Sequence, residues 1–167
     1  MVVERATIDD IDEMYALTRR YASEGLLLPR SQQSLLDRLC STFVARSHPG
    51  GPILGMVGLE VLSRETGEVR SLAVSEAAQG QGVGRRLVEA AVAEARRLNL
   101  RRVISLTLTP GFFSQCGFIP VDRLSLPEKL VRDCFRCPKR LECREVAMVR
   151  WLAAESLHTS AVAEAVG

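Results

Sequence analysis

The chain has 167 residues, of which 47% are hydrophobic and 25% charged, and its formal net charge at pH 7 is +2. This length suits one domain, and the composition excludes an intrinsically disordered chain. The balanced charge argues against a nucleic-acid-binding protein, and no apolar run approaches the roughly 18–20 residues of a membrane span. The first residues lack the layout of a secretory signal, so we expect a cytoplasmic protein without membrane or nucleic-acid partners.

The N-terminal half predicts a strand, two helices and three further strands. Ile11, Met14 and Tyr21 fall on one face of a helix that Thr7 or Asp9 could cap. The turn at 64–67 is of hairpin type, with a positive φ angle expected at its glycine. In chain order the expected elements are strand 2–6, a helix to Gly25, a helix from Ser31 to about Cys40, and strands 42–45, 53–62 and 68–75.

One amphipathic helix dominates the C-terminal half. Residues 83–98 repeat apolar side chains at helical spacing. The β-rich run 102–108 follows this helix, and the usual crossover places it parallel to the strand that ends near Ser75. We therefore expect a mixed α/β sheet in one domain at residues 1–152, followed by an alanine-rich tail at 153–167 that contains His158.

A glycine-dense turn, Gln79-Gly-Gln-Gly-Val-Gly84, lies between the strand 68–75 and the long helix, and Arg85 follows it. Such a turn lets the backbone approach a ligand, and the free N–H groups of a helix N-terminus favour a diphosphate. A plain tight turn, a dinucleotide fingerprint and a triphosphate loop are the competing interpretations. The last two are disfavoured, because no Gly-Lys-Ser/Thr ending is present and the turn follows an antiparallel meander.

Three segments resemble the GNAT superfamily of acyl-CoA-dependent N-acyltransferases. Gln79, Gly82 and Gly84 fit its Gln/Arg-x-x-Gly-x-Gly/Ala signature. Residues 67–75 are similar to its central strand, and residues 112–118 to its second motif, an aromatic pair followed by Gly-Phe. The resemblance implies an α+β fold in which helices flank a mixed, mostly antiparallel sheet with a splayed central strand pair.

The same resemblance implies acetyl-CoA as cosubstrate. In that family the pantetheine arm pairs with free main-chain groups of the central strand, and the pyrophosphate lies on the glycine turn. The cofactor-binding residues implied here are Leu72, Ala73, Val74, Gln79, Gly80, Gln81, Gly82, Val83, Gly84, Arg85 and Phe113.

Within the superfamily, the chain is most similar to the acetyltransferase domain of bacterial N-acetylglutamate synthases, especially the single-domain forms. The matching stretches are 26–31, 68–74, 124–129, the Cys134-x-x-Cys137 pair and 143–148. This implies direct transfer of acetyl to the α-amine of L-glutamate, a step of arginine biosynthesis, and a homodimer is considered because dimers are common in the family. Another small-molecule or protein N-terminal acceptor remains an alternative, as does a non-catalytic acyl-CoA sensor or metal-linked module.

Glu68 is the candidate general base, because several family members place a glutamate at this position of the central strand. Strand alternation predicts that it shares a face with Arg70 and Leu72. An ordinary strand-end carboxylate paired with Arg70 is the equally weighted alternative. A main-chain N–H near Val74 is the expected oxyanion donor.

The acid that protonates the leaving thiolate is a tyrosine in most of the family, and the matching position here is Phe113. A hydroxyl such as Ser114 or Thr107 is the candidate substitute. Unassisted departure is also tolerable, since a free thiol has a pKa of about 8.5.

A glutamate acceptor carries two carboxylates and calls for planar, bidentate donors. Arg30 and Arg70 are the candidates, with Thr107 as a third substrate-binding residue. Arg30 follows Pro29 in an apolar loop, an unusual place for a solvating charge, although a surface role is almost as well supported.

Cys134, Cys137 and Cys143 lie within ten positions, and the first two have metal-site spacing. A structural zinc takes four ligands, and no histidine lies near in sequence. Reduced thiols are therefore the leading interpretation, a disulfide or an incomplete metal site the minor one, and no metal is expected.

Overall fold

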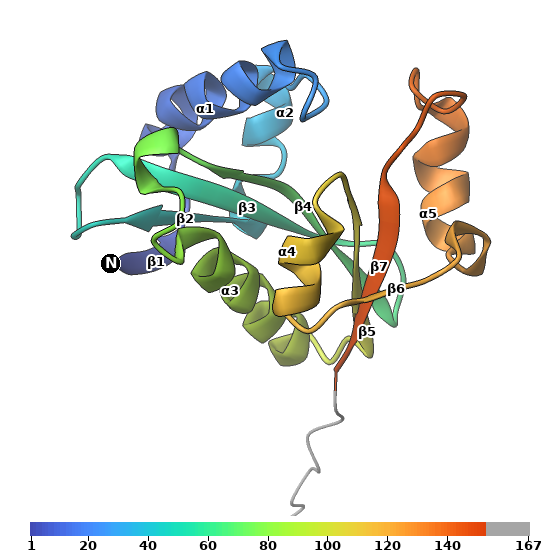
Figure 1. The fold of residues 1–167 in the computed structure, drawn as a ribbon. Coiled ribbons are helices and arrows are strands. Elements are labelled where there is room, and N and C mark those ends of the chain that lie inside the picture. Colours follow the sequence, from blue (N-terminus) through green and yellow to red (C-terminus); the bar gives the residue numbers. More distant parts are fainter. Residues whose placement is uncertain (153–167) are drawn as a thin grey trace, which may run out of the picture.

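The structure is a computed structural model that describes residues 1–152; the predicted tail at 153–167, with His158, lies outside the described residues. Seven strands form one sheet in the order β1-β2-β3-β4-β5-β7-β6 (Figure 1). The strands are β1 Val2–Arg5, β2 Thr42–Arg46, β3 Ile53–Val61, β4 Thr66–Val74, β5 Arg102–Thr107, β6 Ile119–Pro120 and β7 Val146–Trp151.

Neighbouring strands run antiparallel except for β4 and β5, which run parallel. The helix α3, Val83–Arg97, makes the crossover between these two strands. The parallel pairing covers only residues 66–68 of β4, against 102–104 of β5. This confirms the predicted mixed, mostly antiparallel sheet with a splayed central pair.

Helices cover both faces of the sheet. Two helices, α1 and α2, lie on one face, α3 and α4 lie on the other, and α5 stands beside β7 at the far end (Figure 1). No helix among residues 1–152 is both long and apolar enough to cross a membrane. The remaining bounds are α1 Ile11–Ser23, α2 Gln32–Leu36, α4 Pro110–Gln115, α5 Pro127–Arg132 and the 3-10 helices η1 Ile8–Asp10, η2 Leu39–Ser41, η3 Glu76–Ala78, η4 Arg123–Ser125 and η5 Cys134–Arg136.

Each face has its own core. On the α3 face, Leu87 and Val88 are buried against sheet residues such as Val57. On the α1 face, Ile11 and Met14 are buried in a second cluster. The predicted helical periodicities therefore correspond to the buried sides of α1 and α3.

The second helix is shorter than predicted. Ser31 caps it as expected, accepting from the Ser34 N–H at 3.1 Å, but α2 ends at Leu36 instead of near Cys40. The Arg38 carbonyl accepts hydrogen bonds from the hydroxyls of Ser41 and Thr42. These side chains replace the backbone N–H donor that a longer helix would have provided. The chain thereby turns into β2.

Gly67 is not the turn residue that the sequence predicts. It lies within β4 and is not among the residues with positive φ. A Cβ at this position would stand 2.8 Å from Leu100 Cδ1 and 3.1 Å from Leu59 Cδ1. Close packing beneath the sheet, and not backbone freedom, therefore explains this glycine.

Candidate active site

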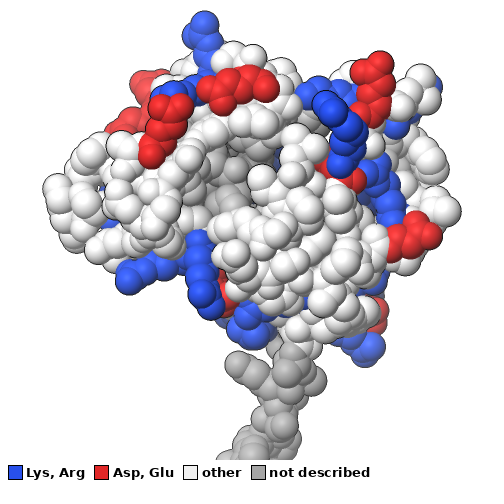
Figure 2. Space-filling view, viewed as in Figure 1, with Lys and Arg blue, Asp and Glu red and all other residues white. Residues whose placement is uncertain are grey.

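A cavity of about 850 Å³ opens where β4 and β5 separate. It is lined by β4, by the end of β5, by the loop 26–30 after α1 and by the segment 123–145 that carries α5. The space-filling view shows the surface hollowed near the centre of this face (Figure 2). The splayed strands therefore form the floor of a site between two parts of the chain that are far apart in sequence.

A bulge in β4 shapes this floor. Met56 and Gly58 of β3 pair with Ala73 and Arg70, so β4 carries one extra residue, and Ser71 has a φ of 53°. Beyond the three pairs at 66–68, the edge of β4 that faces β5 has no strand partner. Its main-chain groups are available to a ligand.

The bulge also corrects the predicted side-chain alternation. Glu68 and Arg70 point to the same side, as expected, with Arg70 Nη1 3.8 Å from Glu68 Oε2. Leu72 instead packs with the cluster beneath α3, as Val74 does, whereas Ala73 packs toward α1. The extra residue reverses the alternation, so Leu72 does not share a face with Glu68.

Glu68 is held in a buried ion pair. Its side chain is buried in the cavity wall, and Lys129 Nζ lies 2.7 Å from Oε1 and 2.8 Å from Oε2. Lys129 is only 6% exposed and also donates to Asp133 Oδ2 at 2.8 Å. The expected pairing with Arg70 is thus present but secondary, and an ammonium that sequence reasoning did not single out is the principal partner.

Arg70 is engaged by carboxylates. Its Nη1 pairs with Glu60. Burial alone would raise the pKa of Glu60, but the positive charges of Arg70, Arg132 and Arg38 outweigh burial and hold this pKa below its usual value. The Arg70 Nε is buried without a hydrogen-bond partner among the described residues. One donor of this guanidinium is therefore buried and unsatisfied beside the cavity wall to which Arg70 belongs.

Arg30 differs from Arg70, because it forms no ion pair or hydrogen bond with any side chain of residues 1–152. Burial, together with repulsion from Arg70 and Arg38, lowers the pKa of Arg30 to about 10. A partly buried cation without a partner is poised for an anionic ligand. The two candidate arginines line the same cavity, as the sequence analysis requires for a shared substrate.

Of the two hydroxyl candidates for the proton donor, only Thr107 lies at the cavity. Thr107 lines the cavity at the end of β5, and its Oγ1 accepts from the Thr109 N–H at 2.9 Å. Ser114 is exposed on α4 and is not part of the cavity wall. Phe113 lines the cavity but is buried, and its ring packs edge-on against Phe112 and Phe118.

The glycine turn stands at the N-terminus of α3. Gly80 and Gly82 have φ angles of 72° and 77°, and a Cβ on either would meet no atom within 4 Å. The surface above the turn is therefore open, and the first N–H groups of α3 have no partner within the helix. Val83 is buried, so only its main chain can face a ligand, whereas Arg85 is exposed. This surface fits a diphosphate.

Two glutamines secure the turn. Gln81 Nε2 donates to the Ala77 carbonyl at 2.7 Å, and Gln79 Nε2 donates to the Tyr21 hydroxyl at 2.9 Å. Tyr21 in turn donates to the Val74 carbonyl. Tyr21 also lines the cavity, a role that its position on the first helix did not reveal.

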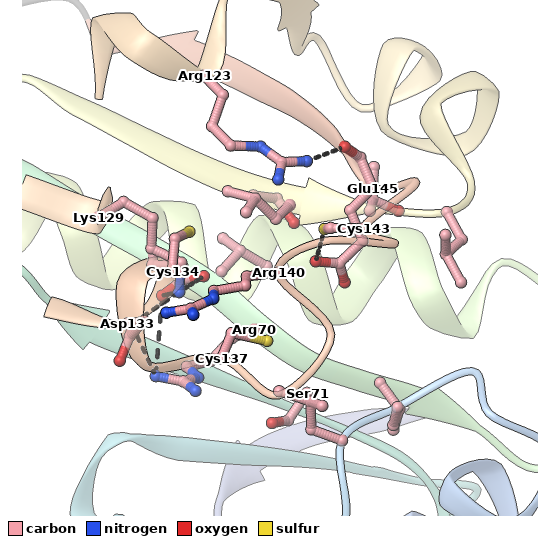
Figure 3. Close-up of a pocket in the computed structure, with 18 of the residues that line it drawn as sticks. Arg70, Ser71, Arg123, Lys129, Asp133, Cys134, Cys137, Arg140, Cys143 and Glu145 are labelled. Atoms are coloured by element: carbon pink, nitrogen blue, oxygen red, sulfur yellow. Dashed lines mark hydrogen bonds and ion pairs between the residues drawn. The ribbon is translucent and has the colours of Figure 1, made fainter. Parts of the chain in front are cut away.

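Sequence reasoning missed most of the segment that closes the cavity. Figure 3 shows Lys129, Asp133, Cys134 and Cys143 around it. Positive charge dominates the wall as a whole. The cations are Arg30, Arg70, Arg123, Lys129, Arg132, Arg136 and Arg140, against the carboxylates Glu68, Asp133 and Glu145.

Comparisons with known proteins agree with this arrangement. A family model described as the acetyltransferase (GNAT) family matches residues 8–118. An uncharacterised N-acetyltransferase of Chlorobaculum tepidum is 36% identical over 150 residues, 90% of this chain and 96% of that protein. The amino-acid acetyltransferase of Mycobacterium tuberculosis is 34% identical over 123 residues, 72% of this chain and 70% of that protein.

A solved structure shows the same likeness. The N-acetylglutamate synthase of Neisseria gonorrhoeae, complexed with coenzyme A and N-acetyl-glutamate, superposes with a TM-score of 0.79 at 27% identity. The match covers 91% of this chain and 35% of that one. The chain therefore spans about a third of that synthase.

Proposed function

Because this chain belongs to the GNAT family of acetyltransferases, we propose that the amine it acetylates is the α-amine of L-glutamate. It is an acetyl-CoA-dependent N-acetyltransferase with relatives named amino-acid acetyltransferases. The observation that carries the choice of acceptor is Arg30, a partly buried cation without a partner among residues 1–152 in a predominantly cationic cavity. A dicarboxylate amino acid complements such a cavity.

Acetyl-CoA supplies an acetyl group activated as a thioester. The edge of β4 at Leu72, Ala73 and Val74 has no strand partner on the β5 side and supports hydrogen bonding to the pantetheine arm, although the Val74 carbonyl already accepts from Tyr21. The main chain of 79–85 supports binding of the pyrophosphate. Phe113 offers an apolar surface between these regions and the acceptor.

The acceptor half of the site is assigned to Arg30, Arg70 and Thr107. Arg30 binds one carboxylate, because its guanidinium forms no ion pair or side-chain hydrogen bond among residues 1–152, although Glu60 and Glu68 act on it from a longer distance. Arg70 adds positive charge to the cavity wall, although Glu60 engages its guanidinium. Thr107 contributes a hydroxyl at the end of β5.

Glu68 is assigned the removal of a proton from the substrate ammonium. The amine nitrogen then forms a bond to the acetyl carbon, the carbon–sulfur bond breaks, and the electron pair leaves on sulfur. Lys129 positions the Glu68 carboxylate, since it contacts both oxygens. For the departing thiolate, Thr107 is assigned as the proton donor, because of the two hydroxyl candidates it lines the cavity and Ser114 does not.

Product detection tests the acceptor. The protein is incubated with acetyl-CoA and an equimolar mixture of the twenty amino acids, and the products are identified by mass spectrometry. We expect N-acetylglutamate to dominate. Acetylation of a different amino acid, or of none, would refute the choice of glutamate and leave the acetyl-CoA half of the site unaffected.

Variants then test Arg30. Loss of charge-assisted hydrogen bonds worth about 1.5–3 kcal/mol corresponds to about a 10- to 100-fold higher KM for glutamate in Arg30→Met. Arg19→Met is the matched control, because Arg19 is exposed on α1 and is not part of the cavity wall. Equal KM values in the two variants would remove Arg30 from the acceptor site.

A further inference from the structure

Three of the five cysteines gather on one wall of the cavity. Cys134, Cys137 and Cys143 all line it, and Figure 3 shows them on the segment that closes the acceptor side. All five cysteines are free thiols, and Cys40 and Cys116 lie elsewhere. The proposed acetyl transfer uses none of these thiols, so their gathering in the cavity has a separate explanation.

Cys134 and Cys137 are positioned by a single helical turn. They begin and follow η5, and the Cys137 N–H donates to the Cys134 carbonyl at 3.2 Å. In a 3-10 helix, side chains three apart eclipse, and three residues rise about 6 Å. Disulfides span Cα separations of about 4.4–6.8 Å. The turn therefore brings the Cα atoms of Cys134 and Cys137 close enough together for a disulfide, which forms once the two side chains rotate toward each other.

A metal site is the less favoured explanation of the cluster. Among residues 1–152, no group of three or more His, Cys, Asp or Glu side chains is arranged to hold a metal ion. The Cys143 thiol instead faces its own neighbour, with Sγ 3.6 Å from Glu145 Oε2. Cys143 is thus engaged by a carboxylate, whereas one hydrogen-bonded turn of backbone joins Cys134 to Cys137.

The surroundings of Cys134 disfavour its thiolate form. Burial raises the pKa of the Cys134 thiol, Lys129 and Arg123 act in the opposite direction, and Cys143 and Asp133 raise it further. A protonated thiol is a poor nucleophile. Exchange at Cys134 is therefore slow at neutral pH and accelerates as pH rises.

We propose that Cys134 and Cys137 form a redox-active dithiol that closes to a disulfide by exchange with a low-molecular-weight disulfide. The thiolate of one cysteine attacks a sulfur of the small disulfide, forms a mixed disulfide and releases one thiolate. The second cysteine, as thiolate, attacks the protein sulfur of that bond and releases the other. Two electrons pass from the protein to the small disulfide, and two small thiols result.

Closure of this turn acts on the acceptor side of the cavity. Only Asp133 separates η5 from α5, and Lys129 of α5 both pairs with Asp133 and holds Glu68. Moving the turn thus displaces groups near the acceptor, whereas the glycine turn at 79–84 is not part of the cavity wall. This effect on turnover rests on the proposed function, but the disulfide itself does not.

Trypsin makes the pairing directly readable, because an arginine or lysine follows each cysteine of the cluster. Cleavage yields 133–136, 137–139 and 141–144, each with one cysteine. The full chain is equilibrated with oxidised glutathione, free thiols are alkylated, and the digest is analysed by mass spectrometry. We expect 133–136 linked to 137–139. Linkage of either to 141–144, no linkage, or thiols that react only after a chelator is added would overturn the proposal.

The activity arm compares oxidised and reduced protein. We expect oxidation to raise the acceptor KM several-fold without changing CoA affinity measured by calorimetry, and dithiothreitol to reverse it. Cys137→Ser abolishes the response, and Cys143→Ser, the matched control, retains it. An unchanged acceptor KM in protein whose cross-link is confirmed would refute the effect on the cavity. Because the cross-link is read by mass without turnover, a wrong acceptor assignment leaves it testable.

Discussion

The ion pair between Glu68 and Lys129 predicts an asymmetric loss of stability. Lys129 has a second carboxylate, Asp133, at 2.8 Å, whereas the next cation to Glu68 is Arg70 at 3.8 Å. Removing the lysine leaves a buried charge poorly compensated, and neutralising the glutamate leaves the lysine paired. Breaking a buried pair costs about 3–5 kcal/mol, so we expect Lys129→Met to lower the free energy of unfolding by about 3 kcal/mol. Glu68→Gln should lower it by about 1–2 kcal/mol.

Urea unfolding followed by circular dichroism measures both losses, provided that the slope with urea stays constant. The double variant should lose less than the sum of the two, by about 1–3 kcal/mol, because the groups are in contact. Arg101→Met is the matched control: its pair with Glu65 is exposed and should be worth about 0.5 kcal/mol. Equal losses in the single variants, or an additive double variant, would refute the reasoning.

Two further predictions concern the glycine turn and acid stability. Gly82→Ala places a side chain on a residue with a φ of 77°, so it should lower the free energy of unfolding by about 1–2 kcal/mol and weaken CoA binding measured by calorimetry. Gly111→Ala, the control, introduces no such strain and should change neither the stability nor CoA binding. A hydrogen bond from Arg97, aided by Arg5, lowers the pKa of Glu94 from 4.5 to about 2. This stabilisation is present above pH 4.5 and is lost as pH falls toward 2. In Glu94→Gln the urea concentration at the unfolding midpoint should therefore change less with pH between 4.5 and 2 than in the unmodified protein. The same pH dependence in both proteins would contradict this assignment.

Elements whose residues interact locally could be predicted from the sequence. The face of α3, the crossover to β5 and the glycine turn all follow from spacing within about 30 residues. The resemblance to the family supplied the splay of β4. The side to which Leu72 points could not be predicted, because a bulge at Ser71 depends on pairing with β3 and has no composition signal.

The closing wall of the cavity was the least predictable part. Lys129 and Glu68 are 61 residues apart, and no motif around either residue indicates that the two side chains form an ion pair. The signal that was available is chemical. Lys129 is one of only two lysines in a chain whose basic residues are otherwise arginines, and it lies directly after a Pro-Glu helix start. A rare cation on a short helix near an apolar stretch indicates a buried partner.

The short parallel pairing between β4 and β5 has a mechanical consequence. Three residue pairs at one end join the two halves of the sheet, and the next six residues of β4 form an arm that pairs with β3 but not with β5. At about 3.3 Å per residue this arm is about 20 Å long, so a rotation of about 5° at the joint widens the open end by about 1.7 Å. The width of the open end therefore depends strongly on the angle between the two halves of the sheet.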